Sequence, residues 1–306
     1  MASKTLAVIL GAGPGTGQAL AVAFAKHHSV ALLARNASAL DSVAAAVRGA
    51  GGDAAPFSCD ATNAESVDAA FAAIRAQWPN HQLKAACFNA ANPFVSKPFL
   101  ELEAKDLKPG LDLNVYGAFH FCQKAIPEML KSGGGFLCFS GATASTKGTF
   151  LLETVAATRL TATPGSANFA AFAPAKFALR GLSQSLAREF GPQGIHVVHA
   201  IIDGEFQLRS MRGTPRGTQQ ASHAGIISTA RIEGMMGKAE EGTVRRSSLP
   251  DEAVAAARTD FRKPVFDVLS QRLEPSAIAD TILHLSQQDR SCWTQEIDMR
   301  PFSEKW

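Results

Sequence analysis

The stretch that decides the fold is residues 10–35, LGAGPGTGQALAVAFAKHHSVALLAR. It starts at the end of an apolar run, turns through four glycines, continues as an Ala-rich run at 16–27 and closes with a second apolar run at 30–35. Glycine permits a tight turn, and the first turn of a helix offers unpaired N–H groups and a positive dipole end. A purely structural turn has the same composition, but the strand before the glycines and the helix after them predict a phosphate-binding loop.

The rest of the chain repeats this alternation of strand-like and helix-like runs. Such alternation is typical of β-α-β units, which build a parallel sheet covered by helices on both faces. Residues 85–88 are apolar at consecutive positions, as expected of a strand that is buried on both sides. We therefore predict a single α/β domain over 1–306 with a doubly wound parallel sheet. The further runs lie at 38–48, 54–59, 64–78, 83–89, 104–131, 135–140, 168–190, 194–202, 276–287 and near 295–299.

Two segments, 146–166 and 205–272, interrupt the alternation. Each follows the end of a predicted strand, where a doubly wound fold normally needs only a few residues. Open α/β sheets bind their ligands at this edge. We interpret both segments as insertions that form a lid over a pocket, with a disordered or decorative excursion as the alternative.

Composition narrows the classes of partner. The chain has 306 residues, 46% of them hydrophobic, and a formal net charge of +3. The basic residues are scattered, which argues against nucleic-acid binding and favours a small-molecule partner. The apolar run at 5–10 is too short to span a membrane. The five cysteines form no C-x-x-C pair of the kind that binds zinc, so we expect them to be buried thiols of a cytoplasmic protein in a reducing compartment. They are Cys59, Cys87, Cys122, Cys138 and Cys292.

The end of the second strand bears on the choice of dinucleotide. A site for NAD(H) places an acidic residue there to accept hydrogen bonds from the ribose hydroxyl. This chain has Ala34 followed by Arg35, whose planar guanidinium suits a ribose 2′-phosphate. The pattern favours NADP(H) over NAD(H), with a solvated strand-end charge as the alternative for Arg35.

With these motifs in place, the chain resembles the short-chain dehydrogenase/reductase family over nearly all of its length apart from the two insertions. The family's motif Thr-Gly-x-x-x-Gly-x-Gly corresponds to LGAGPGTG at 10–17, and its Asn-Asn-Ala-Gly motif corresponds to FNAA at 88–91. The family's acidic residue corresponds to the aspartate in SCDATN at 58–63, and its last strand resembles QEIDMRP at 295–301. The resemblance implies a Rossmann-type sheet of about seven strands and a nicotinamide cofactor. The implied cofactor-binding residues are Gly11, Gly15, Thr16, Gly17, Arg35, Asp60, Ala61, Asn89, Ala90 and Lys176.

The family's proton donor is missing. Its Tyr-x-x-x-Lys motif places a tyrosine and a lysine four residues apart on one face of a helix, and the matching residues here are Phe172 and Lys176. In the family the lysine lowers the pKa of the tyrosine and bonds the nicotinamide ribose. The resemblance also assigns Asn114, in LDLNVYGAFHF, to a water that links the lysine to solvent. The alternative for Lys176 is a surface lysine on an amphipathic helix.

The family's serine is less easily placed. In GGFLCFSGATAS, at 134–145, Ser140 matches the first of two family serines and Gly141 the second, which is usually the catalytic one. Thr143 and Ser145 are alternative hydroxyls. The implied catalytic set is Asn114, Ser140 and Lys176, without a metal.

Other side chains fit catalysis less well. His196 and His199 are three apart on one predicted strand, so they face opposite sides, cannot bind one metal together and are interpreted as structural. Tyr116 lies two residues past Asn114 and faces roughly the other side of that helix. Asp203 is either a loop cap or a general acid with a raised pKa.

Three functions remain open on the sequence alone. The first is an NADPH-dependent oxidoreductase that reduces a carbonyl, imine or conjugated alkene of a small molecule, with the proton delivered from water through Lys176 and Asn114 or from the substrate. The second is a catalytically silent NADPH-binding protein, and the third is an isomerase or cyclase on the same fold. The resemblance also implies a homodimer or homotetramer that packs through the helices at 104–131 and 168–190.

Overall fold

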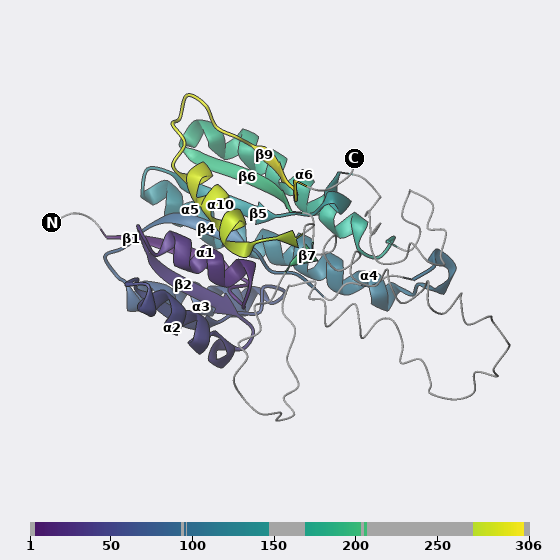
Figure 1. Ribbon diagram of the computed structural model, residues 1–306, viewed down its shortest axis with the longest axis horizontal. Helices are drawn as coiled ribbons and strands as arrows, with labels where there is room; N and C mark the ends of the chain where they lie inside the picture. The colour runs from purple at the N-terminus through teal and green to yellow at the C-terminus, as the bar shows by residue number, and fades with distance from the viewer. Residues whose placement is uncertain are drawn as a thin grey trace, which may run out of the picture.

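The computed structural model describes residues 4–92, 95, 97–146, 169–202, 205–206 and 272–302. Seven parallel strands form its main sheet in the order β3-β2-β1-β4-β5-β6-β9 (Figure 1). The strands are β1 (Thr5–Leu10), β2 (Ser29–Ala34), β3 (Ala54–Ser58), β4 (Gln82–Phe88), β5 (Gly135–Ser140), β6 (Ile195–Ile202) and β9 (Glu296–Met299). The predicted doubly wound sheet is confirmed, and its order reverses between β1 and β4, where such folds bind ligands.

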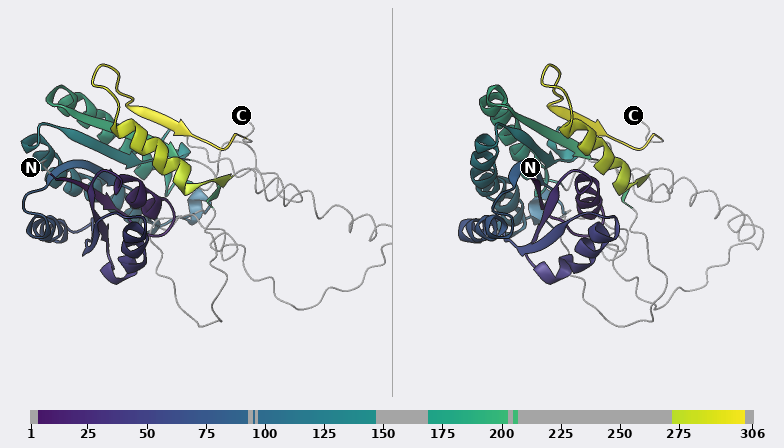
Figure 2. Two further views of the ribbon diagram at one scale, coloured as in Figure 1. Left: turned by 60° about the vertical axis from the view of Figure 1, so that its left-hand side comes forward. Right: turned by 90° about the vertical axis from the view of Figure 1, so that its left-hand side faces the viewer.

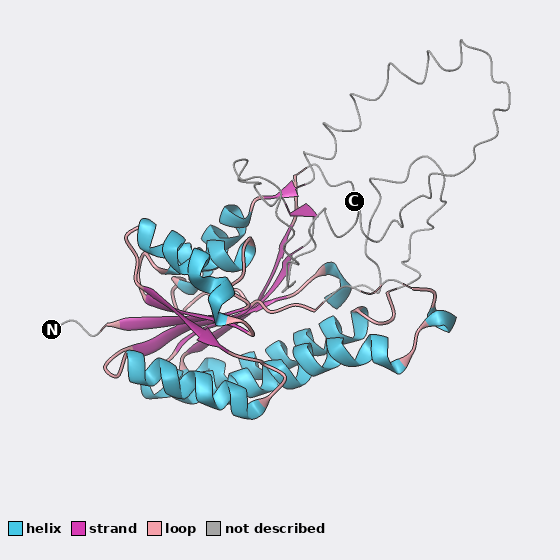
Figure 3. Ribbon diagram, turned by 90° about the horizontal axis from the view of Figure 1, so that it is seen from below, coloured by secondary structure: helices cyan, strands magenta, loops and turns pink. Residues whose placement is uncertain are grey.

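Helices cover both faces of the sheet (Figures 2 and 3). One apolar core lies beneath α1 (Thr16–Phe24), α2 (Asp41–Gly49) and α10 (Pro275–Ser286). The other lies beneath α3 (Ala64–Gln77), α5 (Ala118–Lys131) and α6 (Ala173–Phe190). Every residue of β6 is buried, which explains why the central strands are apolar without alternation.

The predicted helix at 104–131 has a more complex form. It consists of α4 (Ala104–Leu111), a π-helical segment η3 (Asp112–Gly117) and α5 in direct succession. Short π segments inside α-helices are rare and frequently accompany functional sites. The remaining short helices are η1 (Ala37–Leu40), η2 (Phe99–Glu101), η4 (Thr143–Ser145) and η5 (Gly191–Gln193).

The helix predicted at 168–190 starts later than expected. The helix α6 begins at Ala173, with Phe172 as its N-cap residue and Pro174 in its first turn. Proline suits the first turn because its missing N–H would have no helical partner there. Phe172 therefore stands just outside the helix that carries Lys176, although the two residues keep their four-residue spacing.

The two predicted insertions lie mostly outside the described residues. The structure does not describe residues 147–168, which include nearly all of the first insertion, or residues 203–204 and 207–271, which include nearly all of the second. At the ends of the second, β7 (Glu205–Phe206) and β8 (Arg272–Leu273) pair as a two-stranded parallel sheet. The lid interpretation therefore stays a prediction.

The cysteines and helices bear on two further expectations. All five cysteines are free thiols, and four are buried as expected, but Cys292 is exposed because it lies in the loop between α10 and β9. Among the residues that the structure describes, no helix is both long and apolar enough to cross a membrane.

Candidate functional site

The turn after β1 has a backbone that only glycine fits. Gly11 has φ +83°, and a Cβ on it would lie 2.6 Å from the backbone nitrogen of Ala90. A Cβ on Gly17 would lie 2.2 Å from the carbonyl oxygen of Gly11. Gly15, the residue before α1, has φ +93°. The turn is therefore held close to the end of β4 on one side and to the first turn of α1 on the other.

The N-terminus of α1 opens from this turn toward the crevice between β1 and β4. The Gly15 N-cap provides no side chain to cap the helix, and the first turn contains no acidic residue. The first N–H groups of a helix lack helical partners and attract anions. The predicted residue Thr16 lies in this turn and is buried. This helix end is thus arranged to receive a phosphate.

A pocket adjoins the turn at the carboxyl ends of β1, β2 and β4. The predicted residues Arg35, Asp60, Ala61 and Ala90 all line it. Arg35 stands exposed at the strand end, while the Asp60 carboxylate accepts hydrogen bonds from the N–H and hydroxyl of Thr62 at 3.0 and 2.8 Å. The complete lining is Leu10, Gly11, Ala34, Arg35, Cys59, Asp60, Ala61, Thr62, Ala90, Ala91, Asn92, Pro109, Asp112 and Leu113.

The sequence did not indicate Asn92, and it did not indicate Pro109, Asp112 and Leu113, which lie together on the next helical stretch. They come from the turns of α4 and η3 that precede Asn114. Because Asn114 was predicted to belong to the site, the residues just before it on the same helical stretch could have been considered as lining residues too. Nothing in the sequence showed that this helix reaches across the end of β4.

Asn89 lies between the glycine turn and the end of β5. It is absent from the pocket lining, and its side-chain amide donates to the Gly11 carbonyl at 3.0 Å. Its Oδ1 accepts the Ser140 hydroxyl at 2.8 Å. Asn89 therefore ties the glycine turn to the end of β5 and contributes by positioning.

These features together fit a nicotinamide dinucleotide. The crevice offers free amides for a pyrophosphate, a small-residue floor at Gly11 and Ala90, and the Arg35 guanidinium at the rim. The N–H groups and the guanidinium suit the negative charge of the ligand, and the small residues leave room for it to approach the backbone.

The second half of the site is a cluster at the end of β5, formed by Ser140, Gly141, Lys176 and His199, which we call the β5 corner. Lys176 is buried, with 4% of its surface exposed, so the surface-lysine alternative is wrong. Its ammonium donates to the Ser140 carbonyl at 3.0 Å and lies 5.9 Å from the centre of the Phe172 ring. Burial lowers the pKa of Lys176 to about 8.

The three candidate hydroxyls are all engaged. The Ser140 hydroxyl donates to Asn89, and the Ser145 hydroxyl donates to the Ala142 carbonyl at 2.6 Å. Thr143 accepts a hydrogen bond from the Arg300 guanidinium at 2.6 Å. The structure therefore brings Ser140 to the corner through its carbonyl oxygen, which faces Lys176, while its hydroxyl supports Asn89.

Asn114 lies buried within η3. Its side-chain amide donates to the Gly110 carbonyl at 3.0 Å, while its Oδ1 has no hydrogen-bond partner among the described residues. Gly110 in turn lies against the start of α6, because a Cβ on it would be 3.3 Å from that of Ala175. A buried, unpaired oxygen beside α6 is suited to hold a water, as the resemblance implied for Asn114. Tyr116 is 60% exposed and does not share this environment.

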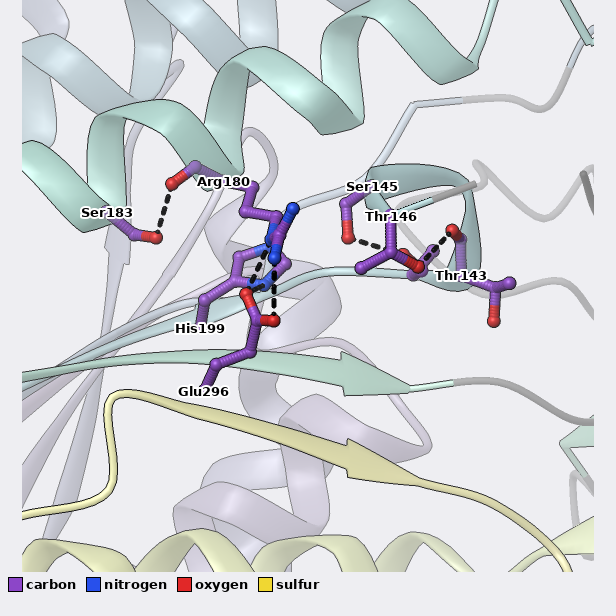
Figure 4. A network of polar contacts seen from close by, with 8 residues as sticks. Thr143, Ser145, Thr146, Arg180, Ser183, His199 and Glu296 are labelled. Atoms are coloured by element: carbon purple, nitrogen blue, oxygen red, sulfur yellow. Dashed lines mark hydrogen bonds and ion pairs between the residues drawn. The ribbon is translucent and has the colours of Figure 1, made fainter. Parts of the chain in front are cut away.

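His196 and His199 face opposite sides of the sheet, as expected. His196 stacks on Trp293 with ring centres 4.8 Å apart and contacts the Thr294 carbonyl at 2.8 Å through Nε2. His199 lies beneath α6, beside Arg180 and Glu296 (Figure 4). No group of three metal-ligating side chains occurs within the described ranges. Asp203 lies outside the described residues.

Comparison with known proteins gives the family. The model described as short chain dehydrogenase matches residues 5–207. D-threitol dehydrogenase of Mycolicibacterium smegmatis is 31% identical over 193 residues, covering 63% of this chain and 66% of that relative. This chain thus matches slightly less than two thirds of that enzyme.

Solved structures agree with this assignment. A short-chain dehydrogenase from Rhodopseudomonas palustris is 27% identical, with a TM-score of 0.64, and the match covers 99% of this chain and 100% of that one. A metagenomic short-chain oxidoreductase in complex with NADP shares the fold at 18% identity and a TM-score of 0.62, covering 97% of each chain. Because the family model extends over more than half of the sequence, the chain belongs to the short chain dehydrogenase family.

Proposed function

We propose that the protein is an NADP(H)-dependent oxidoreductase that acts on a carbonyl, imine or conjugated alkene of a small molecule. The observation that carries this proposal is the buried Lys176, whose ammonium is held at the Ser140 carbonyl 3.0 Å away, next to a crevice built for a dinucleotide. When bound, the nicotinamide supplies or accepts a hydride. Burying an ammonium is costly, so its retention at this place favours a role in binding the nucleotide.

Arg35 and its surroundings support the preference for NADP(H). The position that would hold an acid in an NAD(H) site is Ala34, and both residues line the pocket. A guanidinium can bond a phosphate with two parallel hydrogen bonds, whereas a carboxylate there would repel it. We assign the ribose 2′-phosphate to Arg35 and the adenine side to Asp60 and Ala61.

Lys176 and Asn114 provide the polar groups nearest to the chemistry. With a pKa of about 8, the Lys176 amine exchanges its proton readily near neutral pH. We assign it to the nicotinamide ribose hydroxyls and, with a water held by Asn114 Oδ1, to the path by which a proton reaches the site.

Phe172 limits which substrates can react. Its phenyl ring stands where the family has the tyrosine hydroxyl, and removing a general acid typically costs about 10²–10⁴-fold in rate. An alkene or iminium needs less protonation than a ketone as hydride arrives. Reactive substrates of this kind are therefore favoured over simple ketones.

Restoring the hydroxyl tests this assignment. Phe172→Tyr is expected to raise the rate of NADPH oxidation with cyclohexanone by at least about 10-fold, because a general acid is regained. Phe172→Leu is the matched control and should not raise it, and the NADPH affinity of both variants should stay near that of the parent. A Phe172→Tyr variant that binds NADPH but reacts no faster contradicts the placement of residue 172.

A catalytically silent NADPH-binding protein is the second candidate. It is favoured by the same Phe172 and by the engagement of the Ser140 and Ser145 hydroxyls. This reading expects tight NADPH binding and no hydride transfer to any carbonyl, imine or alkene tested.

A homodimer or homotetramer also belongs to the proposal. Tyr116, Phe119 and Phe177 are 60%, 50% and 42% exposed on η3, α5 and α6. Large exposed aromatic side chains on neighbouring helices mark protein interfaces. Light scattering should give a mass of at least two chains, and replacing Phe119 by Lys should shift it toward one.

A further inference from the structure

His199 has the features of an unused functional group. Its side chain is 1% exposed, and neither Nδ1 nor Nε2 has a hydrogen-bond partner among the described residues. Leaving a buried polar atom unpaired destabilises the folded state, so native proteins rarely do so without a reason. By contrast, His196 on the same strand is paired with the Thr294 carbonyl. The unpaired ring lies at the β5 corner, within range of the charges of Lys176, Arg180 and Glu296.

The place of the ring explains the glycine at position 141. The Gly141 N–H donates to the Ala200 carbonyl at 2.7 Å, which fixes the chain just after β5 against β6. A Cβ on Gly141 would lie 2.4 Å from both Cε1 and Nε2 of His199. The tip of the imidazole therefore fills the space into which a side chain at 141 would project. By the family resemblance, that side chain would be the catalytic serine.

The neighbours of the ring decide which nitrogen carries the proton. His199 Nδ1 lies 3.7 Å from Glu296 Oε2, and Arg180 holds the two carboxylate oxygens of Glu296 at 2.6 and 2.9 Å (Figure 4). The Arg180 bonds lower the pKa of Glu296, so it is ionised. Burial, against the opposing effect of Glu296, lowers the pKa of His199 to about 4, so the imidazole is neutral. A carboxylate facing Nδ1 favours the proton on that atom, which leaves Nε2 with a free lone pair.

We propose that His199 Nε2 stands in for the hydroxyl missing at position 141 and accepts a hydrogen bond from the hydroxyl of an alcohol bound at the β5 corner. The inference rests on the carbonyl case of the proposed function, in which that alcohol is the reduced partner of the redox pair; His199 then supplies a carbonyl–alcohol pair with a contact that Phe172 does not. It narrows the substrate class, because an alcohol can donate to a lone pair whereas a carbonyl oxygen cannot. It also replaces the structural role expected for His199 from its strand position.

Four variants separate this role from simple packing. His199→Phe keeps the ring but removes both nitrogens, and His199→Gln keeps a donor and an acceptor. His199→Ala opens the space, and the double variant Gly141→Ser with His199→Ala places a hydroxyl in it. The assay is NADP⁺-dependent oxidation of cyclohexanol, isopropanol and glycerol, with the NADPH Kd from calorimetry and the Tm measured for every variant.

The loss of one substrate hydrogen bond has a defined signature. His199→Phe should lower kcat/KM for the alcohol at least about 10-fold while the NADPH Kd changes less than about twofold, and His199→Gln should keep more activity than His199→Phe. If His199→Phe does not fold, the comparison passes to the double variant, which should exceed His199→Ala by about 10-fold.

The contrary results are distinct. If His199→Phe folds and is as active as the parent, the proposal is overturned. If His199→Phe does not fold, the proposal is overturned when the double variant has no higher kcat/KM than His199→Ala. A parent protein that binds NADPH but oxidises none of the three alcohols also overturns it. Failure of the parent to bind NADPH contradicts the proposed function itself, on which the inference depends.

Discussion

The two halves of the candidate site are built in different ways. The glycine turn and the α1 N-terminus present backbone groups, and the turn is fixed by Asn89 on one side and by the close approach of Gly17 on the other. The β5 corner depends on side chains, with the buried Lys176 ammonium held at the Ser140 carbonyl and the His199 ring packed against Gly141.

Unpaired polar atoms follow the same division. Of the buried side-chain atoms without a hydrogen-bond partner in the described residues, Asn114 Oδ1 and the two His199 nitrogens lie by α6 or the β5 corner. Only His81 Nδ1 lies elsewhere. A site built from backbone groups is lost when a substitution forces the backbone to move, whereas a site built from side chains changes its chemistry when one of them is replaced. The predictions that follow test this contrast.

The largest effect is expected at the glycine turn. Gly11→Ala places a Cβ 2.6 Å from the backbone of Ala90 at a φ of +83°, where L-residues are strained. We expect the NADPH Kd to rise at least about 100-fold, because the phosphate cradle itself must move. Gly181→Ala is the control, since nothing lies within 4 Å of its Cβ in α6. It should leave the Kd unchanged and raise stability by about 0.5–1 kcal/mol. An unchanged Kd in Gly11→Ala contradicts the placement of the phosphates.

Arg35 should give a smaller but more selective effect. Arg35→Ser removes one charge-assisted contact, so the NADPH Kd is expected to rise about 10–100-fold. The NADH Kd should stay within about twofold, because NADH has no 2′-phosphate. Arg48→Ser serves as a control in which a charge is lost elsewhere in the same half of the sheet. Equal losses for both nucleotides would show that Arg35 does not read the phosphate.

The smallest effect on affinity is expected at Lys176. Lys176→Met should raise the NADPH Kd by about 10-fold, through loss of its contact with the ribose. Stability should move the other way, because burial lowers the Lys176 pKa from 10.5 to about 8. The unfolded chain therefore binds more protons between these two values, and the stability of the parent rises with pH across that window.

This linkage gives Lys176→Met a pH signature. Below pH 8 the penalty for burying the charge is fully present, and removing it is worth up to about 3 kcal/mol to the variant. The gain should shrink as pH rises from 8 toward 10.5. Denaturant unfolding of both proteins at several pH values measures it. A pH-independent difference would mean that the Lys176 amine is solvated.

The fold and the glycine turn were predictable because they rest on local pattern. The glycine spacing, the apolar runs and the strand-end Arg35 each act through their own backbone position, and sequence shows these directly. The pocket lining by Asp112 and Leu113 was missed because it depends on how α4 and η3 cross the end of β4.

The reaction half was less predictable because its contacts join distant segments. The alternation of side chains along β6 placed His199 on the face opposite His196. It did not show that the His199 ring would meet Gly141, which directly follows the neighbouring strand β5. The start of α6 at Ala173 was missed because the four-residue motif suggested a continuous helix, whereas Pro174 favours a helix start. The hydroxyls of Ser140 and Ser145 could not be assigned without their acceptors.

The most direct test of the account is a calorimetric titration of the protein with NADPH and with NADH. We predict micromolar or tighter binding of NADPH, with NADH at least about 10-fold weaker, since one charged contact distinguishes them. Such a result supports a nucleotide site built from the glycine turn and Arg35. Binding of neither nucleotide would contradict the central claim, and the glycine turn would then be only a structural element.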